Sequence, residues 1–144
     1  MTAAQVRSRL LGTWRLVSYE TVEPGPGGRR GKPYGDAIGR LEYDTHGNMA
    51  GQVMRPGRAR VEFGGGAAQQ VRAAYTGYIA YFGTYDVASD GTRVIHHVEG
   101  ALNPSWIGGQ QVRGLRFEGD RLVLTAEVMK GGRTMAHVLT WEKY

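Results

Sequence analysis

Cysteine is absent from the 144 residues of this chain. Its absence excludes disulfides, thiolate metal sites and cysteine nucleophiles, and it fits a reducing cytoplasm. Long apolar runs are also missing, since no segment approaches the ~20 apolar residues that a membrane span needs. The first ten residues contain Arg7 and Arg9 and lack the apolar stretch of a signal peptide. We therefore expect a cytoplasmic protein with no membrane partner.

Lysine is scarce, although the chain is basic. Only three of the 18 basic residues are lysines, and the net charge is +5. Such a charge raises nucleic acid as a partner, because clustered cations neutralise phosphates. The arginines are instead scattered singly, and the one dense run, 55–60, lies in a loop with proline and glycine. A basic stripe with interleaved aromatic residues is missing, so we expect no nucleic-acid partner.

Segments of alternating hydrophobicity dominate the rest of the chain. A helix is predicted over 3–11, ended by Gly12, and a second helix over 67–75. Between the first two strands, 23–35 is rich in proline and glycine and predicts a long surface loop, a mobile lip. The predicted strands are 14–22, 38–43, 48–55, 78–87, 92–99, 109–118, 121–128 and 134–142.

The spacing of these strands predicts the fold class. They follow one another closely, whereas a parallel sheet would need a helix after each strand. Closing such a meander into a barrel removes its exposed edges. The length fits one domain over 1–144. The predicted fold is all-β, a closed antiparallel up-and-down β-barrel with an N-terminal plug helix and one short inserted helix.

Several short blocks along the chain carry a family resemblance. They are Gly12-Thr13-Trp14, Gly39-Arg40-Leu41 with Tyr43, Tyr81-Phe82-Gly83-Thr84-Tyr85, His96-His97-Val98-Glu99, Asn103-Pro104-Ser105-Trp106, Gln111-Val112-Arg113, Gly119-Asp120-Arg121-Leu122 and Leu139-Thr140-Trp141-Glu142. In this order they resemble the bacterial and fungal lipocalin-like domain family over nearly the whole chain. The resemblance implies a calycin-type, lipocalin-like barrel with an internal cavity. Some barrels of this general kind serve natural-product pathways as cyclases or isomerases, although fold alone does not set function.

The two-residue period of the strands predicts which side chains face the cavity. Apolar walls with a few polar groups are typical of a small-molecule site, and we expect Ile79, Phe117 and Leu139 to contact a ligand. The full inward set is Ile79, Tyr81, Gly83, Tyr85, Val87, Val94, His96, Val98, Arg113, Leu115, Phe117, Met135, His137, Leu139 and Trp141.

His96 lies between two inward valines and has two interpretations. It is either a satisfied core group or a proton carrier, because an imidazole near its unperturbed pKa exchanges a proton at physiological pH. Tyr81 and Tyr85 on the preceding strand are expected across from it. His96, Tyr81 and Tyr85 are therefore the candidate catalytic residues. His137, with the same phase near the barrel end, is a candidate ligand contact.

Arg113 also has an inward phase, and a guanidinium that cannot lose its proton needs a partner. In the structural interpretation it pairs with Glu42, Glu99 or backbone carbonyls. It would then close one end of the barrel under Trp14. The family resemblance implies that an arginine from a late strand stacks on this tryptophan. In the functional interpretation it clamps a carboxylate or enolate of a ligand.

Trp106 and Met54 complete the candidate ligand contacts. Asn103, Pro104 and Ser105 favour a turn, which presents Trp106 at a rim, either to cap the core or to stack on a flat ligand. Met54 could adapt the cavity to an irregular apolar guest or fill an ordinary core. The histidines lack the spacing of a metal site, so we expect no metal and no cofactor.

Two functions remain open from the sequence. In the first, the barrel binds a largely apolar organic molecule and acts as a cyclase or isomerase of a polyketide-like natural product, with His96, Tyr81, Tyr85 or Arg113 polarising a carbonyl. The alternative is a non-catalytic binding or carrier protein. Whether the chain is an enzyme, and whether it is a monomer or a homodimer, is not decided by the sequence.

Overall fold

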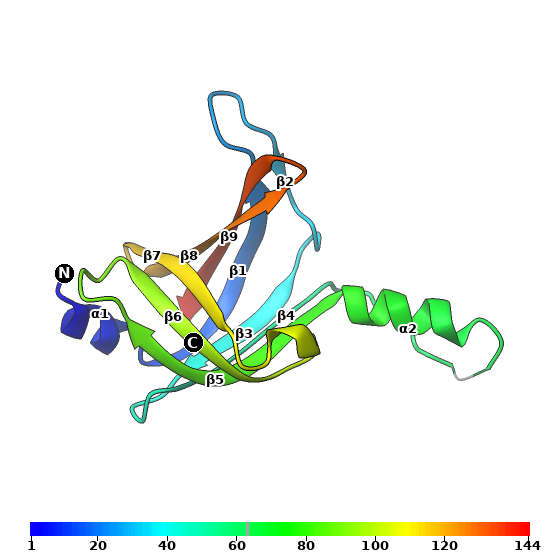
Figure 1. Cartoon of the computed structure of the whole chain (residues 1–144), viewed down its shortest axis with the longest axis horizontal. Helices are drawn as coiled ribbons and strands as arrows, with labels where there is room; N and C mark the ends of the chain where they lie inside the picture. The colour runs from blue at the N-terminus through cyan, green and yellow to red at the C-terminus, as the bar shows by residue number, and fades with distance from the viewer. Residues whose placement is uncertain (63) are drawn as a thin grey trace.

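Eight long antiparallel strands follow one another in up-and-down order, and the first also pairs with the last, which closes the sheet (Figure 1). The computed structural model describes residues 1–62 and 64–144, with the backbone alone at Lys130. The long strands are β1 (Gly12–Val22), β3 (Ile38–Tyr43), β4 (Asn48–Met54), β5 (Tyr78–Val87), β6 (Arg93–Ala101), β7 (Gln110–Glu118), β8 (Arg121–Lys130) and β9 (Arg133–Lys143). The predicted closed all-β barrel is confirmed.

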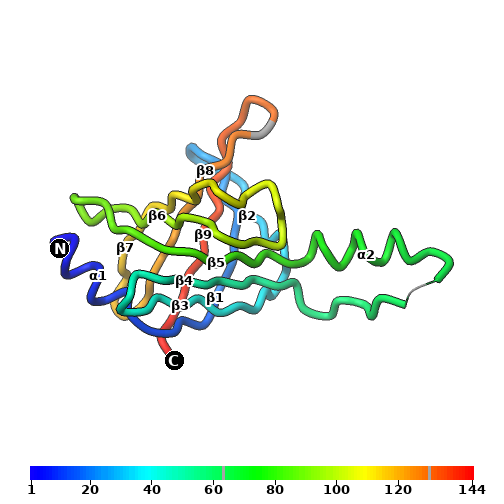
Figure 2. The backbone as a smooth tube through the Cα atoms, turned by 60° about the horizontal axis from the view of Figure 1, so that its bottom comes forward, coloured from blue at the N-terminus to red at the C-terminus, as the bar shows by residue number. Residues whose placement is uncertain are grey.

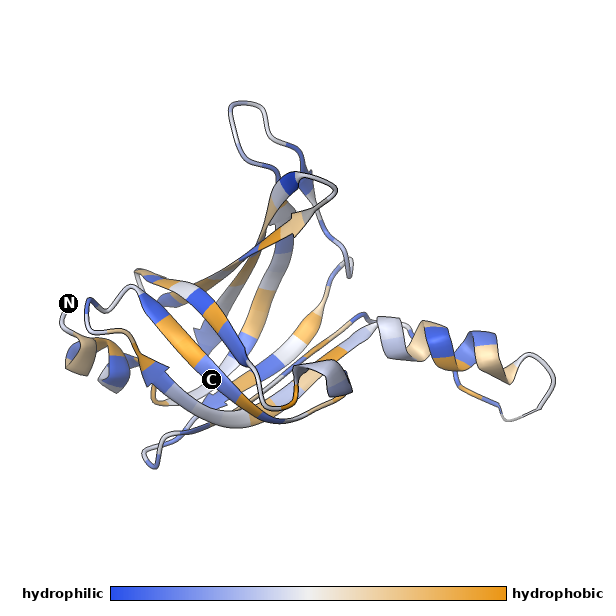
Figure 3. Cartoon of the chain, viewed as in Figure 1, coloured by the Kyte–Doolittle hydropathy of each residue, from blue (hydrophilic) through white to orange (hydrophobic). Residues whose placement is uncertain are grey.

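The strands alternate between the core and solvent, and Figure 3 shows the matching alternation of hydropathy along them. In β6, Val94, His96 and Val98 are buried, whereas Arg93 and Glu99 are exposed. In β3 the same alternation buries Leu41 and Tyr43. This period of two is the physical basis on which side chains can be assigned to the interior.

Helix α1 (Ala3–Leu10) plugs one end of the barrel. Its Val6 and Leu10 are buried in the same core as Trp14, and the indole N–H of Trp14 donates to the carbonyl of Leu10 at 2.8 Å. Gly12, at φ +122°, turns the chain from the helix into β1, a conformation that residues with a Cβ rarely adopt. The predicted plug helix is therefore confirmed.

Two arginines of α1 fasten the plug to the barrel wall. The Arg7 guanidinium lies 4.9 Å from the ring centre of Tyr85. The Arg9 guanidinium lies 3.9 Å from that of Phe117 and also donates to the carbonyl of Gly119 at 2.7 Å. Cation–π contacts of this kind contribute about 0.5–1 kcal/mol each at exposed sites.

Helix α2 (Ala67–Thr76) lies between β4 and β5, as predicted, and has no buried residue. It extends away from the barrel on the side opposite α1 in both views (Figures 1 and 2). β4 and β5 continue as a paired hairpin up to Met54 and Tyr78, so the segment around α2 is an appendage on an intact hairpin. No helix in the described part of the chain is long and apolar enough to span a membrane.

The predicted loop over 23–35 contains a short strand that the sequence analysis did not anticipate. β2 (Arg30–Gly31) pairs with Thr21 and Val22 at the end of β1. The loop therefore folds back on the barrel instead of running free. Farther along, Tyr34 donates its hydroxyl to the carbonyl of Thr76 at 2.9 Å, joining this loop to the base of α2.

Candidate functional site

A cavity of about 450 Å³ occupies the barrel interior, within the range of about 300–1,000 Å³ typical of small-molecule sites. Its wall is mainly apolar and aromatic. Most of the predicted site residues line it: Ile79, Tyr81, His96, Trp106, Arg113, His137 and Leu139. The remaining lining residues are Tyr19, Leu41, Gly51, Gln52, Val53, Gln111, Leu124, Ala126, Glu127, Val128 and Trp141.

His96 is the most deeply buried polar group of the cavity, with 2% of its surface exposed. Both ring nitrogens are engaged by tyrosines. The Tyr43 hydroxyl lies 2.7 Å from Nε2, and the Tyr81 hydroxyl lies 2.6 Å from Nδ1. The expected approach of Tyr81 is confirmed, whereas Tyr43, from β3, was not anticipated.

The environment holds these groups neutral. Burial, with a smaller effect from the nearby Arg113 charge and from His97, lowers the pKa of His96 from 6.5 to about 3. Burial also raises the pKa of Tyr43 well above its usual value, and the pKa of Tyr81 as well. Near neutral pH the three side chains therefore form an uncharged hydrogen-bonded chain. The expectation of an imidazole near its unperturbed pKa is wrong, because desolvation disfavours the imidazolium.

Arg113 supplies the positive charge of the cavity wall. Its guanidinium donates to the Oε1 of Gln111 at 2.9 Å and to the carbonyl of Val112 at 3.0 Å. Neither Glu42 nor Glu99 forms an ion pair with it. The expected stack on Trp14 is not seen either, since Lys143 lies there, with its Nζ 5.1 Å from the ring centre. Of the structural partners expected for Arg113, only the backbone carbonyl type is found, at Val112, and Arg113 also lines the cavity, as its functional interpretation requires.

His137 belongs to a second tyrosine–histidine pair in the same cavity. The hydroxyl of Tyr19 lies 2.7 Å from its Nδ1. Burial, and less strongly the Arg113 charge, lowers the pKa of His137. Burial, with a smaller effect from Tyr34, raises the pKa of Tyr19 to about 12, although Arg113 opposes this. This pair too is neutral near physiological pH.

Trp106 stands at the cavity rim on a short 3₁₀ turn, η1 (Pro104–Trp106). Asn103 caps that turn through its side-chain oxygen, which accepts from the Ser105 N–H at 3.0 Å. The indole meets the Tyr81 ring edge to face, with centroids 6.1 Å apart. The turn thus places Trp106 in the wall of the cavity, in agreement with its predicted place at a rim.

Three predicted site residues lie outside the cavity, namely Tyr85, Phe117 and Met54. Tyr85 and Phe117 have the predicted inward phase but lie at the plugged end, where Arg7 and Arg9 of α1 cover them. Tyr85 is the cross-strand partner of His96, as expected, but its hydroxyl donates to the carbonyl of Asp44 at 3.0 Å. The period of a strand fixes the face of a side chain but not the end of the barrel toward which it extends, which explains the difference.

Met54 lies on the outer side of the barrel. Val53 is buried and lines the cavity, whereas Met54, the next residue of β4, is not among the cavity-lining residues. Met54 instead lines a shallow outer groove with Ile38, Tyr78 and Tyr144. The expected contact of Met54 with the lumen is therefore corrected by the phase of its strand.

Trp141 carries an unused donor in the cavity wall. Its indole Nε1 is buried and has no hydrogen-bond partner among the described residues. A buried donor without an acceptor costs roughly 1–3 kcal/mol. The inward phase of Trp141 could be read from the sequence, but its unpaired N–H could not.

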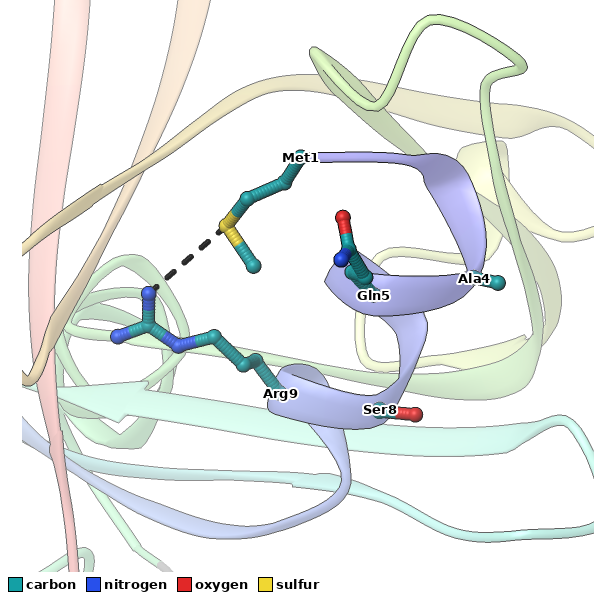
Figure 4. Close-up of a pocket in the computed structure, with 5 residues that line it drawn as sticks. All are labelled: Met1, Ala4, Gln5, Ser8 and Arg9. Carbon is teal, nitrogen blue, oxygen red and sulfur yellow. Dashed lines mark hydrogen bonds between the residues drawn. The ribbon is translucent and has the colours of Figure 1, made fainter.

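A second hollow, of about 460 Å³, lies against α1 and is not a comparable site (Figure 4). All of its lining residues belong to the N-terminal segment, and they include Met1, whose sulfur lies 3.9 Å from Nη1 of Arg9. Within residues 1–62 and 64–144, no group of His, Asp and Glu side chains is arranged to hold a metal.

Residues 11–144 match the model of the lipocalin-like domain. This chain belongs to the lipocalin-like domain family. A protein of Aspergillus oryzae described as the 4′-hydroxy-3′-methoxypropiophenone carrier protein ppsC is 37% identical over 106 residues, which are 66% of this chain and 96% of that protein. Among solved structures, the siderocalin Ex-FABP is similar over 94% of this chain and 74% of its own, with 10% identity and a TM-score of 0.37.

Proposed function

We propose that this protein binds a small aromatic organic molecule inside the barrel and acts as a non-catalytic carrier in secondary metabolism. The observation that carries the proposal is the interior cavity of about 450 Å³, which combines apolar walls with Arg113, His96 and Tyr81. Such a cavity gains affinity from its walls and orients the ligand with its polar groups. The carrier description of the Aspergillus oryzae relative supports the same function.

The cyclase or isomerase interpretation has less support. A general acid or base works best with a pKa near the operating pH, whereas that of His96 is lowered to about 3. Both of its nitrogens are also occupied by tyrosine hydroxyls. The relative is described as a carrier. Catalysis by His96, Tyr81 or Tyr85 stays a prediction, and so do the cytoplasmic location and the oligomeric state.

A calorimetric titration with 4′-hydroxy-3′-methoxypropiophenone tests the proposal. Wild-type protein is expected to bind one equivalent saturably. Ala126→Phe, which fills the cavity, is expected to weaken binding tenfold or more, about 1.4 kcal/mol. Ala50→Phe is the matched control, because Ala50 pairs with Glu42 and Phe82 and is not among the cavity-lining residues. Equal binding by both variants, or no binding by the wild type, would contradict an interior site.

A further inference from the structure

The tyrosine–histidine chain has a direction that follows from counting donors and acceptors. A neutral imidazole has one N–H and one bare nitrogen. Tyr43 is buried, and among the described residues its hydroxyl has no hydrogen-bond partner other than Nε2 of His96. A buried hydroxyl keeps its proton in a hydrogen bond, so Tyr43 donates to Nε2. The N–H of His96 is then on Nδ1 and donates to the Tyr81 oxygen.

Tyr81 is consequently left with a free hydroxyl proton. Its oxygen accepts from Nδ1 of His96, so its own O–H is available to another acceptor. Tyr81 lines the cavity, and consecutive hydrogen bonds of this kind polarise one another. The chain from Tyr43 through His96 therefore ends in a donor directed by the protein at whatever occupies the cavity.

Arg113 adds a positive charge beside this donor. The described carboxylates form no ion pair with Arg113, and Glu127, the acidic residue of the cavity wall, is exposed. The Arg113 charge lowers the pKa of Tyr81, which burial raises. It also lowers the pKa of His96, as burial does. The titratable groups on the other strands that face it are Tyr19, Tyr43 and His137, all of them neutral near physiological pH.

We infer that Tyr81 and Arg113 together bind an anionic oxygen of an aromatic ligand, so that an acidic phenol is held as its phenolate. The Tyr81 hydroxyl and the guanidinium donate to that oxygen, and charge-assisted hydrogen bonds of this kind are about twice as strong as neutral ones. The ring lies against the aromatic surface of Trp106 and Tyr81. This inference rests on the proposed binding of an aromatic molecule in the cavity, and it adds the charge state that the cavity selects.

A spectral titration with 4-nitrophenol tests the inference, because its phenolate absorbs visible light and the neutral phenol does not. Bound to the wild type, the probe is expected to ionise at least about one pH unit lower than in solution, which corresponds to about tenfold tighter binding of the phenolate. Arg113→Met and Tyr81→Phe should each remove much of this shift. Arg116→Met, on the exposed face of the same strand, and Tyr78→Phe, on the outer groove, are the matched controls.

The neutral analogue 4-nitroanisole separates this inference from the proposed function. If 4-nitroanisole binds and bound 4-nitrophenol ionises as it does in solution, the selection of an anion is contradicted while interior binding stands. If neither compound binds, both are contradicted. Equal effects of Arg113→Met and Arg116→Met would also overturn the assignment to Arg113. Should Arg113→Met fail to fold, the wild-type shift together with its retention in Arg113→Lys decides the outcome.

Discussion

At the scale of single residues, His96 shows how burial changes the chemistry of a side chain. An exposed histidine titrates near neutral pH. His96 instead lies between two tyrosine hydroxyls in a site where an imidazolium would lose its hydration, and its pKa falls to about 3. It therefore acts as a fixed hydrogen-bonding link from Tyr43 to Tyr81 and not as a pH-dependent charge.

This burial predicts how stability depends on pH. Above about pH 6.5 the imidazole is neutral in both the folded and unfolded chain. Below that pH the unfolded chain binds a proton that folded His96 does not bind until about pH 3. The free energy of unfolding therefore decreases as the pH is lowered from about 6.5 to about 3. The expected slope from His96 alone approaches about 1.4 kcal/mol per pH unit.

Urea unfolding at a series of pH values measures this slope. His96→Gln is expected to lose the His96 component, whereas His46→Gln, in the exposed turn between β3 and β4, should keep it. A His96→Gln protein with the wild-type slope would show that His96 is not held neutral in the folded state.

The sequence predicted which site residues face the barrel interior better than it predicted their contacts. Alternation placed His96, Arg113 and Leu139 correctly in the interior. It gave no sign that Tyr43 is the partner of Nε2, because Tyr43 and His96 are 53 positions apart and meet only across the closed barrel. Long-range hydrogen bonds depend on the relative depth of two strands, which the periodicity of each strand does not contain.

At the scale of elements, the short turns join the paired strands of the barrel, and the long connections carry the additional elements β2 and α2. The hairpin turn between β3 and β4 is held by Asp44, whose carboxylate accepts from the backbone N–H groups of His46 and Asn48 at 2.9 and 2.8 Å. Such Asx turns are legible in a sequence, and the strand bounds were accordingly predicted closely. β2 is only two residues long, too short for any periodic signal, and it was missed.

The appended α2 segment should be dispensable for folding. α2 buries no residue, and most helical stability in proteins comes from packing. Replacing 59–74 by a short Gly–Ser linker is therefore expected to lower the helical circular dichroism signal and to change the free energy of unfolding by less than about 1 kcal/mol, the scale of surface changes. Arg55 and Gly77, whose backbone groups are hydrogen-bonded at 2.8 Å, are kept to close the hairpin.

This expectation is checked by measuring melting curves and the calorimetric binding of 4′-hydroxy-3′-methoxypropiophenone on the shortened and wild-type proteins. A large loss of stability would show that α2 packs on the barrel in solution. Loss of binding with stability intact would show instead that the segment contributes to the ligand site.

At the scale of the whole molecule, the plug gives the barrel two unlike ends. α1 closes one end through Val6, Leu10 and Trp14, and the cavity lies farther along, beyond Tyr85 and Phe117. The tyrosines and histidines that line it are neutral near physiological pH, and Arg113 and the exposed Glu127 carry its charges. This arrangement is the basis for the proposed binding of a small aromatic molecule inside the barrel.

The three tryptophans give the most direct test of binding inside this barrel. Trp106 and Trp141 line the cavity, whereas Trp14 lies at the plugged end with its N–H bonded to Leu10. In a ¹H–¹⁵N correlation spectrum, saturating 4′-hydroxy-3′-methoxypropiophenone is expected to shift the indole N–H signals of Trp106 and Trp141 and to leave that of Trp14 nearly unchanged. Unshifted Trp106 and Trp141 signals, with changes confined to α1, α2 or the outer face, would contradict a ligand site in the barrel interior.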